Sequence, residues 1–123
     1  MKVTTEKNEK VANMIFGSIY PLYLNRLEKN GRTKDELNEV IEWLTGFDET
    51  KIQAFIDEKA TFRTFFEKAN MHPNAHMIKG VVCGYRIEEI EDEFELYKQC
   101  RQMEKLIDEL AKGRKMEKIK RTA

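Results

Sequence analysis

The chain has 123 residues and a net charge of zero, because 22 basic residues balance 22 acidic ones. A chain of this length fits one domain, and a hydrophobic content of 41% is enough to fill one core. A neutral chain has no overall field that would attract nucleic acid or an anionic membrane. The sequence has no apolar run of roughly 18 residues, which a transmembrane helix needs, and its polar start MKVTTEKNEK lacks the apolar middle of a signal peptide. We therefore expect a cytoplasmic, single-domain protein without a membrane partner.

The first ten residues are polar and offer almost nothing apolar to offset the entropy lost on ordering them. We predict a disordered tail over 1–10 and a single domain over 11–123.

The next stretch shows two helix signals in succession. Ser18 can cap a helix that tolerates Pro21 in its first turn and that ends at Asn30 and Gly31. The T-x-x-E string of Thr33 and Glu36 is a capping box, which predicts a second helix that ends at Gly46. The apolar stripe of this second helix is Leu37, Val40, Ile41 and Leu44.

Two shorter helices follow, with Asp48 and Thr61 as their caps. Their apolar stripes are Ile52, Phe55 and Ile56 in the first, and Phe62, Phe65, Phe66 and Ala69 in the second.

The second half of the chain begins after a proline-containing loop over 70–75. Apolar residues at helical spacing predict a helix over 78–90, although VVCGY at 81–85 alone is also compatible with a short strand. A long C-terminal helix then runs to Gly113, and a basic tail follows over 114–121. The prediction is an all-α, single compact domain of five to seven helices with a long C-terminal helix.

Four strings occur in a fixed order: FGSIYPLYL at 16–24, GRTKDELNEVIEWLTGFD at 31–48, GVVCGYRIEEIED at 80–92 and EKLIDELAKGRKMEKI at 104–119. Together they resemble the signature blocks of the prokaryotic domain-of-unknown-function family 2200, over nearly the whole chain after the tail. The chain departs from the family pattern at Glu93, where the family tends to have proline, and over 94–103. The resemblance implies a common fold and no particular activity.

The candidate functional surface lies where an apolar run with one arginine gives way to six carboxylates. Its members are Arg86, Glu88, Glu91, Asp92 and Glu95. On a helix the four acidic members would share one face, which is a solvated surface, a docking surface for a basic partner, or a cation-binding or catalytic cluster. Carboxylates alone lack the fixed geometry of acid–base catalysis.

Cysteine and histidine provide the other candidates for chemistry. Cys83 could be a nucleophile beside Arg86, but its apolar neighbours favour a buried packing role, with Gly84 against another helix and Arg86 paired to a carboxylate. Cys83 and Cys100 form no Cys-x-x-Cys pair, so we expect free thiols. His72 and His76 have the spacing of a helical metal pair, but the intervening Pro73 argues against a helix, and no metal or cofactor is predicted.

We interpret the sequence as that of a small interaction or regulatory module, with a protein partner or with itself as a homo-oligomer. The alternative is a small enzyme with a site around the Cys83–Glu95 segment. Nucleic acid is not an expected partner, because the helix over 34–45 has four acidic residues and one lysine and would repel phosphates. The basic tail is the better nucleic-acid candidate, and the sequence leaves a small-molecule ligand open.

Overall fold

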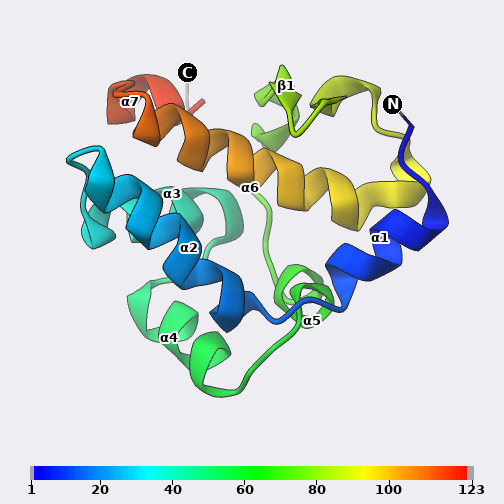
Figure 1. The fold of residues 1–123 in the computed structure, drawn as a ribbon, viewed down its shortest axis with the longest axis horizontal. Coiled ribbons are helices and arrows are strands. Elements are labelled where there is room, and N and C mark those ends of the chain that lie inside the picture. The colour runs from blue at the N-terminus through cyan, green and yellow to red at the C-terminus, as the bar shows by residue number, and fades with distance from the viewer. Residues whose placement is uncertain (1, 122–123) are drawn as a thin grey trace.

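The computed structural model describes residues 2–121, and one long helix organises them. Helix α6 (Glu95–Ala111) runs across the molecule and contacts α1, α2, α3, α5 and α7 as well as the β-hairpin (Figure 1). Helix α4 lies at the opposite end of the molecule from the hairpin. The part of the chain that the structure describes forms one compact domain with seven α-helices and a two-stranded sheet. The fold class predicted from the sequence is thus confirmed.

Side-chain caps begin most of the N-terminal helices. The helices are α1 (Thr5–Ala12), α2 (Phe16–Lys29), α3 (Lys34–Thr45), α4 (Glu49–Asp57) and α5 (Phe62–Glu67). Thr33, Asp48 and Thr61 cap α3, α4 and α5 as predicted. The capping box is complete, because the Glu36 N–H donates to Thr33 Oγ1 at 3.2 Å and the Thr33 N–H donates to Glu36 Oε1 at 3.1 Å.

The prediction of a disordered tail over 1–10 is corrected here. Residues 5–10 belong to α1, which is capped by Thr4. This helix is held by α6 rather than by a long apolar stripe of its own. Asn8 Oδ1 accepts the Tyr97 N–H at 3.1 Å, and Lys7 Nζ donates to the Tyr85 hydroxyl at 2.5 Å. Contacts with residues far along the chain therefore order a segment that is too polar to predict as ordered.

Helix α2 begins two residues before the predicted Ser18 cap. Ile15 is its N-cap without a side-chain hydrogen bond, and the Ile15 backbone pairs instead with Thr61 in an isolated bridge. Pro21 consequently lies inside the helix rather than in its first turn.

The core is one cluster that contains the predicted stripe of α3, whose four residues are each at most 1% exposed. Its centre is a group of phenylalanines around Phe65, which contacts the rings of Phe16, Phe47, Phe55, Phe62 and Phe66. Phe16 stacks on Phe65 with centroids 4.4 Å apart, and the others meet it edge-on.

The predicted helix over 78–90 is wrong, and the short-strand alternative is right. Strands β1 (Val81–Val82) and β2 (Tyr85–Arg86) pair antiparallel, with Val82 opposite Tyr85. Cys83 and Gly84 form the turn with φ of 52° and 82°, which is the left-handed geometry that a two-residue hairpin requires. Both are exposed, so the predictions that Cys83 is buried and that Gly84 packs against a helix are also wrong.

Short elements complete the chain around α6. Single 3-10 turns cover Ala75–Met77, Ile87–Glu89 and Asp92–Phe94, and α7 (Met116–Ile119) follows α6. Over residues 2–121, none of the helices combines the length and the apolar character needed to cross a membrane.

Candidate functional site

The five residues of the predicted surface lie on the hairpin, on two 3-10 turns and at the start of α6, rather than on one helix face. Glu88 accepts the Gly80 N–H at 3.1 Å, and Arg86 forms the expected ion pair with Glu88, at 4.0 Å. Asp92 pairs with Lys98 Nζ at 3.3 Å. The chain from 88 to 95, which we call the acidic segment, therefore runs through two 3-10 turns into α6 and does not form one continuous helix face.

Carboxylates crowd the acidic segment, and all of them are exposed. They are Glu88, Glu89, Glu91, Asp92, Glu93 and Glu95. The hydrogen bond and the negative charge of Glu91 raise the pKa of Glu93. Backbone N–H groups of Glu88 and Gly80 lower the pKa of Glu88 instead. Negative charge is thus concentrated around Glu91 and Glu93, where like charges face each other.

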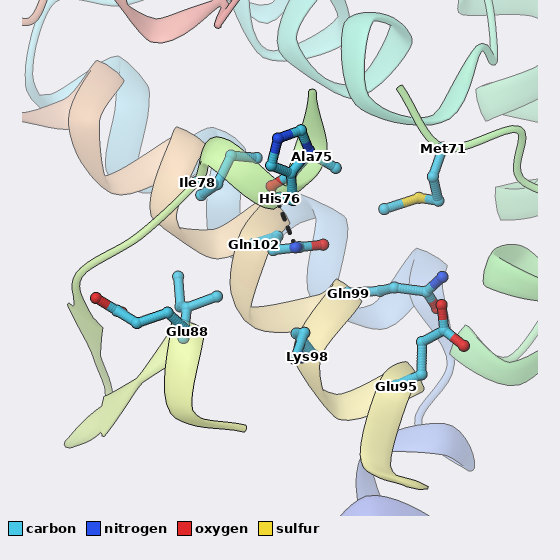
Figure 2. A pocket seen from close by; sticks show the side chains of 10 residues that line it. Met71, Ala75, His76, Ile78, Glu88, Glu95, Lys98, Gln99 and Gln102 are labelled. Atoms are coloured by element: carbon cyan, nitrogen blue, oxygen red, sulfur yellow. Dashed lines mark hydrogen bonds between the residues drawn. The ribbon is translucent and has the colours of Figure 1, made fainter. Parts of the chain in front are cut away.

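A groove of about 360 Å³ lies beside this segment, between the loop at 71–78, the hairpin side and α6 (Figure 2). Its apolar lining is Met71, Ala75, Ile78 and Ile87, and its polar lining is His76, Glu88, Glu95, Lys98, Gln99 and Gln102. Gln102 Nε2 donates to the Ala75 carbonyl at 3.2 Å and fastens the loop to α6. The groove therefore combines an apolar floor with two carboxylates of the predicted surface.

The structure separates the other predicted residues from this groove. Arg86 and Glu91 line a smaller hollow of about 180 Å³ together with Phe94 and the N-terminal residues Lys2 and Val3. Asp92 lines neither hollow.

Cys83 belongs to a different pocket, whose other members the sequence did not single out. Its Sγ lies 3.6 Å from Glu104 Oε2, and Cys100 Sγ lies 3.7 Å from Glu104 Oε1. Burial and the Glu104 charge raise the pKa of the Cys83 thiol. Because the thiolate is the reactive form, this environment does not activate Cys83 as a nucleophile. Only the i, i+4 spacing of Cys100 and Glu104 could have suggested their contact.

The two histidines make separate contacts. His72 stacks on Trp43 with centroids 4.2 Å apart, and its Nδ1 accepts the Asn74 N–H at 3.0 Å. His76 Nδ1 lies 2.9 Å from the Pro73 carbonyl oxygen. Within residues 2–121, no group of three or more histidine, cysteine, aspartate or glutamate residues is placed to hold a metal ion.

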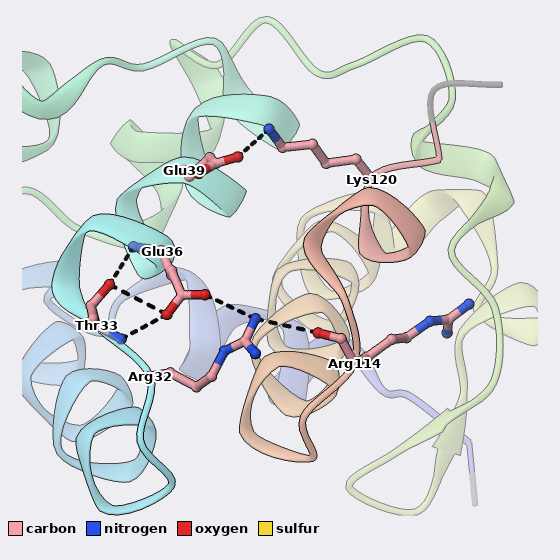
Figure 3. Close-up of polar contacts among 6 residues, drawn as sticks. All are labelled: Arg32, Thr33, Glu36, Glu39, Arg114 and Lys120. Atoms are coloured by element: carbon pink, nitrogen blue, oxygen red, sulfur yellow. Dashed lines mark hydrogen bonds and ion pairs between the residues drawn. The ribbon is translucent and has the colours of Figure 1, made fainter.

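The basic tail contacts α3 and the chain at Arg32 (Figure 3), while Lys115 and Lys118 are exposed. Lys120 pairs with Glu39 of α3, and the Arg114 carbonyl accepts a hydrogen bond from Arg32 at 3.3 Å. Arg121 binds both oxygens of the buried Glu109, at 2.7 and 2.8 Å. Arg114 also pairs with Glu109, at 3.1 Å, so three of the five basic residues of the tail form ion pairs with the domain.

Comparisons with known proteins agree with this architecture. A family model described as "Uncharacterized protein conserved in bacteria (DUF2200)" matches residues 10–121. The crystal structure of uncharacterized protein SP1917 is 34% identical in sequence and has a TM-score of 0.83, with 90% of each chain covered. No curated protein matches the chain.

Proposed function

The chain belongs to the bacterial domain-of-unknown-function family 2200, and we propose from its own surface that it is a small protein-interaction module. The docking surface is the acidic segment with the adjoining groove. The partner is a basic segment of another protein that also offers an apolar side chain.

The observation that carries this proposal is the concentration of exposed carboxylates over 88–95. Arg86 and Lys98 pair with Glu88 and Asp92, whereas Glu91 and Glu93 face each other. A lysine or arginine from a partner would relieve this repulsion and form charge-assisted hydrogen bonds. Surface charge of one sign also speeds the encounter with an oppositely charged partner.

The groove supplies the apolar part of the recognition. Ile78 and Ile87 are buried at its floor, and Met71 is only partly covered. A volume of about 360 Å³ is large enough for a leucine or methionine side chain. Methionine adapts its shape to such an inserted group, and a few buried apolar anchors carry most of the energy of an interface.

The other interpretations have less support from the geometry. For an enzyme around Cys83–Glu95, the raised pKa of the Cys83 thiol works against a nucleophilic role. For nucleic-acid binding or for self-association through opposite charges, the tail offers the exposed Lys115 and Lys118, because Arg114, Lys120 and Arg121 pair with carboxylates of the domain.

Fluorescence anisotropy with labelled peptides tests the proposal. The probes are ten-residue peptides of alternating lysine and leucine, and the same peptides with glutamate or with serine in place of lysine. We expect binding of the lysine–leucine peptide alone, with an affinity that falls as salt is raised. The double variant Glu91→Lys/Glu93→Lys should weaken this binding about tenfold or more.

The matched control is Glu42→Lys/Glu58→Lys, which makes the same charge change at exposed sites at the ends of α3 and α4. It should leave the affinity within about twofold of wild type, because both sites lie outside the acidic segment. The proposal would be contradicted if both double variants lost affinity for the lysine–leucine peptide equally, or if the wild-type protein did not bind this peptide.

A further inference from the structure

A second pocket, of about 440 Å³, lies between α2, the hairpin and α6, and shares no lining residue with the groove. Its apolar side is Val81, Val82 and Ile107. Tyr23, Cys83 and Glu104 form a polar side, and Arg26, Asp108 and Lys112 form another. Its size is within the range of pockets that hold small organic molecules.

The Tyr23 hydroxyl is the unexplained group in this pocket. It is buried and has no hydrogen-bond partner among the described residues. Burial raises its pKa well above the usual range, with further contributions from Cys100 and Glu104, so the hydroxyl keeps its proton. A buried donor without an acceptor is costly, and a ligand oxygen would satisfy it. Cys83 lines the same pocket from the exposed hairpin turn, with its Sγ 3.6 Å from Glu104 Oε2.

The second polar group of the pocket, Arg26, Asp108 and Lys112, has one more positive than negative charge. Asp108 is shared by two cations, since it pairs with Arg26 and, at 3.0 Å, with Lys112. Lys112 and Arg26 are 71% and 49% exposed, so both can also reach an incoming anion. Two cations on one carboxylate leave one positive charge for a ligand.

We propose that this pocket binds a small carboxylic acid that has a second oxygen function and a short branched apolar body. The carboxylate lies between Arg26 and Lys112, and the alkyl group packs on Val81, Val82 and Ile107. The second oxygen, a carbonyl or hydroxyl, accepts the hydrogen bond of Tyr23. The proposal is independent of the peptide-docking surface, because the two sites use different residues.

Thermal shift and isothermal titration with four related compounds test the assignment. The probes are 4-methyl-2-oxopentanoate and 4-methyl-2-hydroxypentanoate. The comparison compounds are 4-methylpentanoate, which lacks the second oxygen, and 4-methyl-1-pentanol, which lacks the carboxylate. We expect the two probes to bind about tenfold or more tightly than either comparison compound, because each of the latter leaves one polar side of the pocket unpaired.

Tyr23→Phe is the informative variant, because it removes only the unpartnered hydroxyl. The free variant should melt no lower than wild type, while binding of both probes weakens about tenfold. Lys112→Gln should weaken both probes and 4-methylpentanoate, but not the alcohol.

Tyr20→Phe is the matched control, since the Tyr20 hydroxyl donates to Asn38 in the core at 2.5 Å. It should lower the melting temperature without changing probe binding. The proposal is overturned if neither probe binds, if Tyr23→Phe binds them as wild type does, or if Tyr23→Phe destabilises the free protein as Tyr20→Phe does.

Discussion

At the scale of single residues, Glu109 shows why the tail beyond α6 is part of the fold. Its carboxylate is buried near the C-terminal end of α6 and pairs with Arg121 at 2.7 Å and with Arg114 at 3.1 Å. Arg121 is itself largely buried and binds both oxygens. A buried carboxylate needs such partners, because the loss of one leaves charge uncompensated in a medium of low polarity.

We predict that Arg121→Gln lowers the free energy of unfolding by about 2 to 4 kcal/mol, with Arg114 retaining part of the compensation. Urea denaturation followed by circular dichroism would measure the change. The control is Arg63→Gln, which removes an exposed pair with Glu9 and should cost less than about 1 kcal/mol. If Arg121→Gln and Arg63→Gln lowered the free energy of unfolding by similar amounts, the burial of Glu109 would be unimportant for stability.

At the scale of elements, the hairpin is held by its turn and by α6. The Ile87 N–H donates to the Gly80 carbonyl at 2.9 Å and closes the hairpin below the strands. Cys83 has φ of 52°, a conformation that is costly for most residues with a side chain and less so for asparagine.

Cys83→Asn should therefore stabilise the hairpin, because Asn-Gly is the preferred pair for this turn. We expect exchange of the Ile87 amide hydrogen to slow by about two- to fivefold, measured by NMR under native conditions. Gly84→Ala places a side chain at φ of 82° and should speed the same exchange. Faster exchange of the Ile87 amide in Cys83→Asn than in Gly84→Ala would contradict the assigned turn.

Helix α2 contains a second strained position. Pro21 lies in its interior, where it cannot donate a hydrogen bond to the Gly17 carbonyl and its ring crowds that carbonyl. The side chain is exposed, so it adds little packing in return.

Pro21→Ala should raise the free energy of unfolding by about 1 to 3 kcal/mol, because it restores the hydrogen bond and removes the crowding. Chemical denaturation would measure this gain. Leu22→Ala is the control at the next position, which is 60% exposed, and should change stability by less than about 0.5 kcal/mol. A Pro21→Ala variant less stable than wild type would show that the helix depends on the proline.

At the scale of the whole molecule, ion pairs join elements that are distant in sequence. Asp108 of α6 binds Arg26 of α2 and Lys112. Burial raises the pKa of Asp108, but the hydrogen bonds from Arg26 and Lys112 outweigh this effect, and the net pKa is lowered. The folded state therefore binds fewer protons at this site than the unfolded state does.

The stabilisation from Asp108 is present above its unfolded pKa of about 3.9 and is lost as the pH falls through the lower folded value. We predict that Asp108→Asn is less stable than wild type at pH 6 and that the difference shrinks below about pH 4. Urea unfolding between pH 6 and pH 2 would measure both curves. Parallel curves would mean that Asp108 does not contribute to the acid sensitivity.

The sequence by itself determined the helical class, the starts of α3, α4 and α5, and the buried stripe of α3. These features could be predicted because a cap acts over three residues and helical periodicity over a few turns. The concentration of carboxylates over 88–95 could also be predicted, since it is a property of neighbouring residues.

Only the tertiary structure decided how these local features are used. The segment 81–85 satisfies the patterns of both helix and strand, and contacts of β1 with α6 accompany the hairpin that forms. Helix α1 is ordered by Tyr85 and Tyr97, from the second half of the chain. The pocket lined by Tyr23 of α2 and Glu104 of α6 likewise brings together two residues that are more than 80 positions apart in the sequence. Such contacts depend on how distant segments pack, and no periodicity within a segment encodes them.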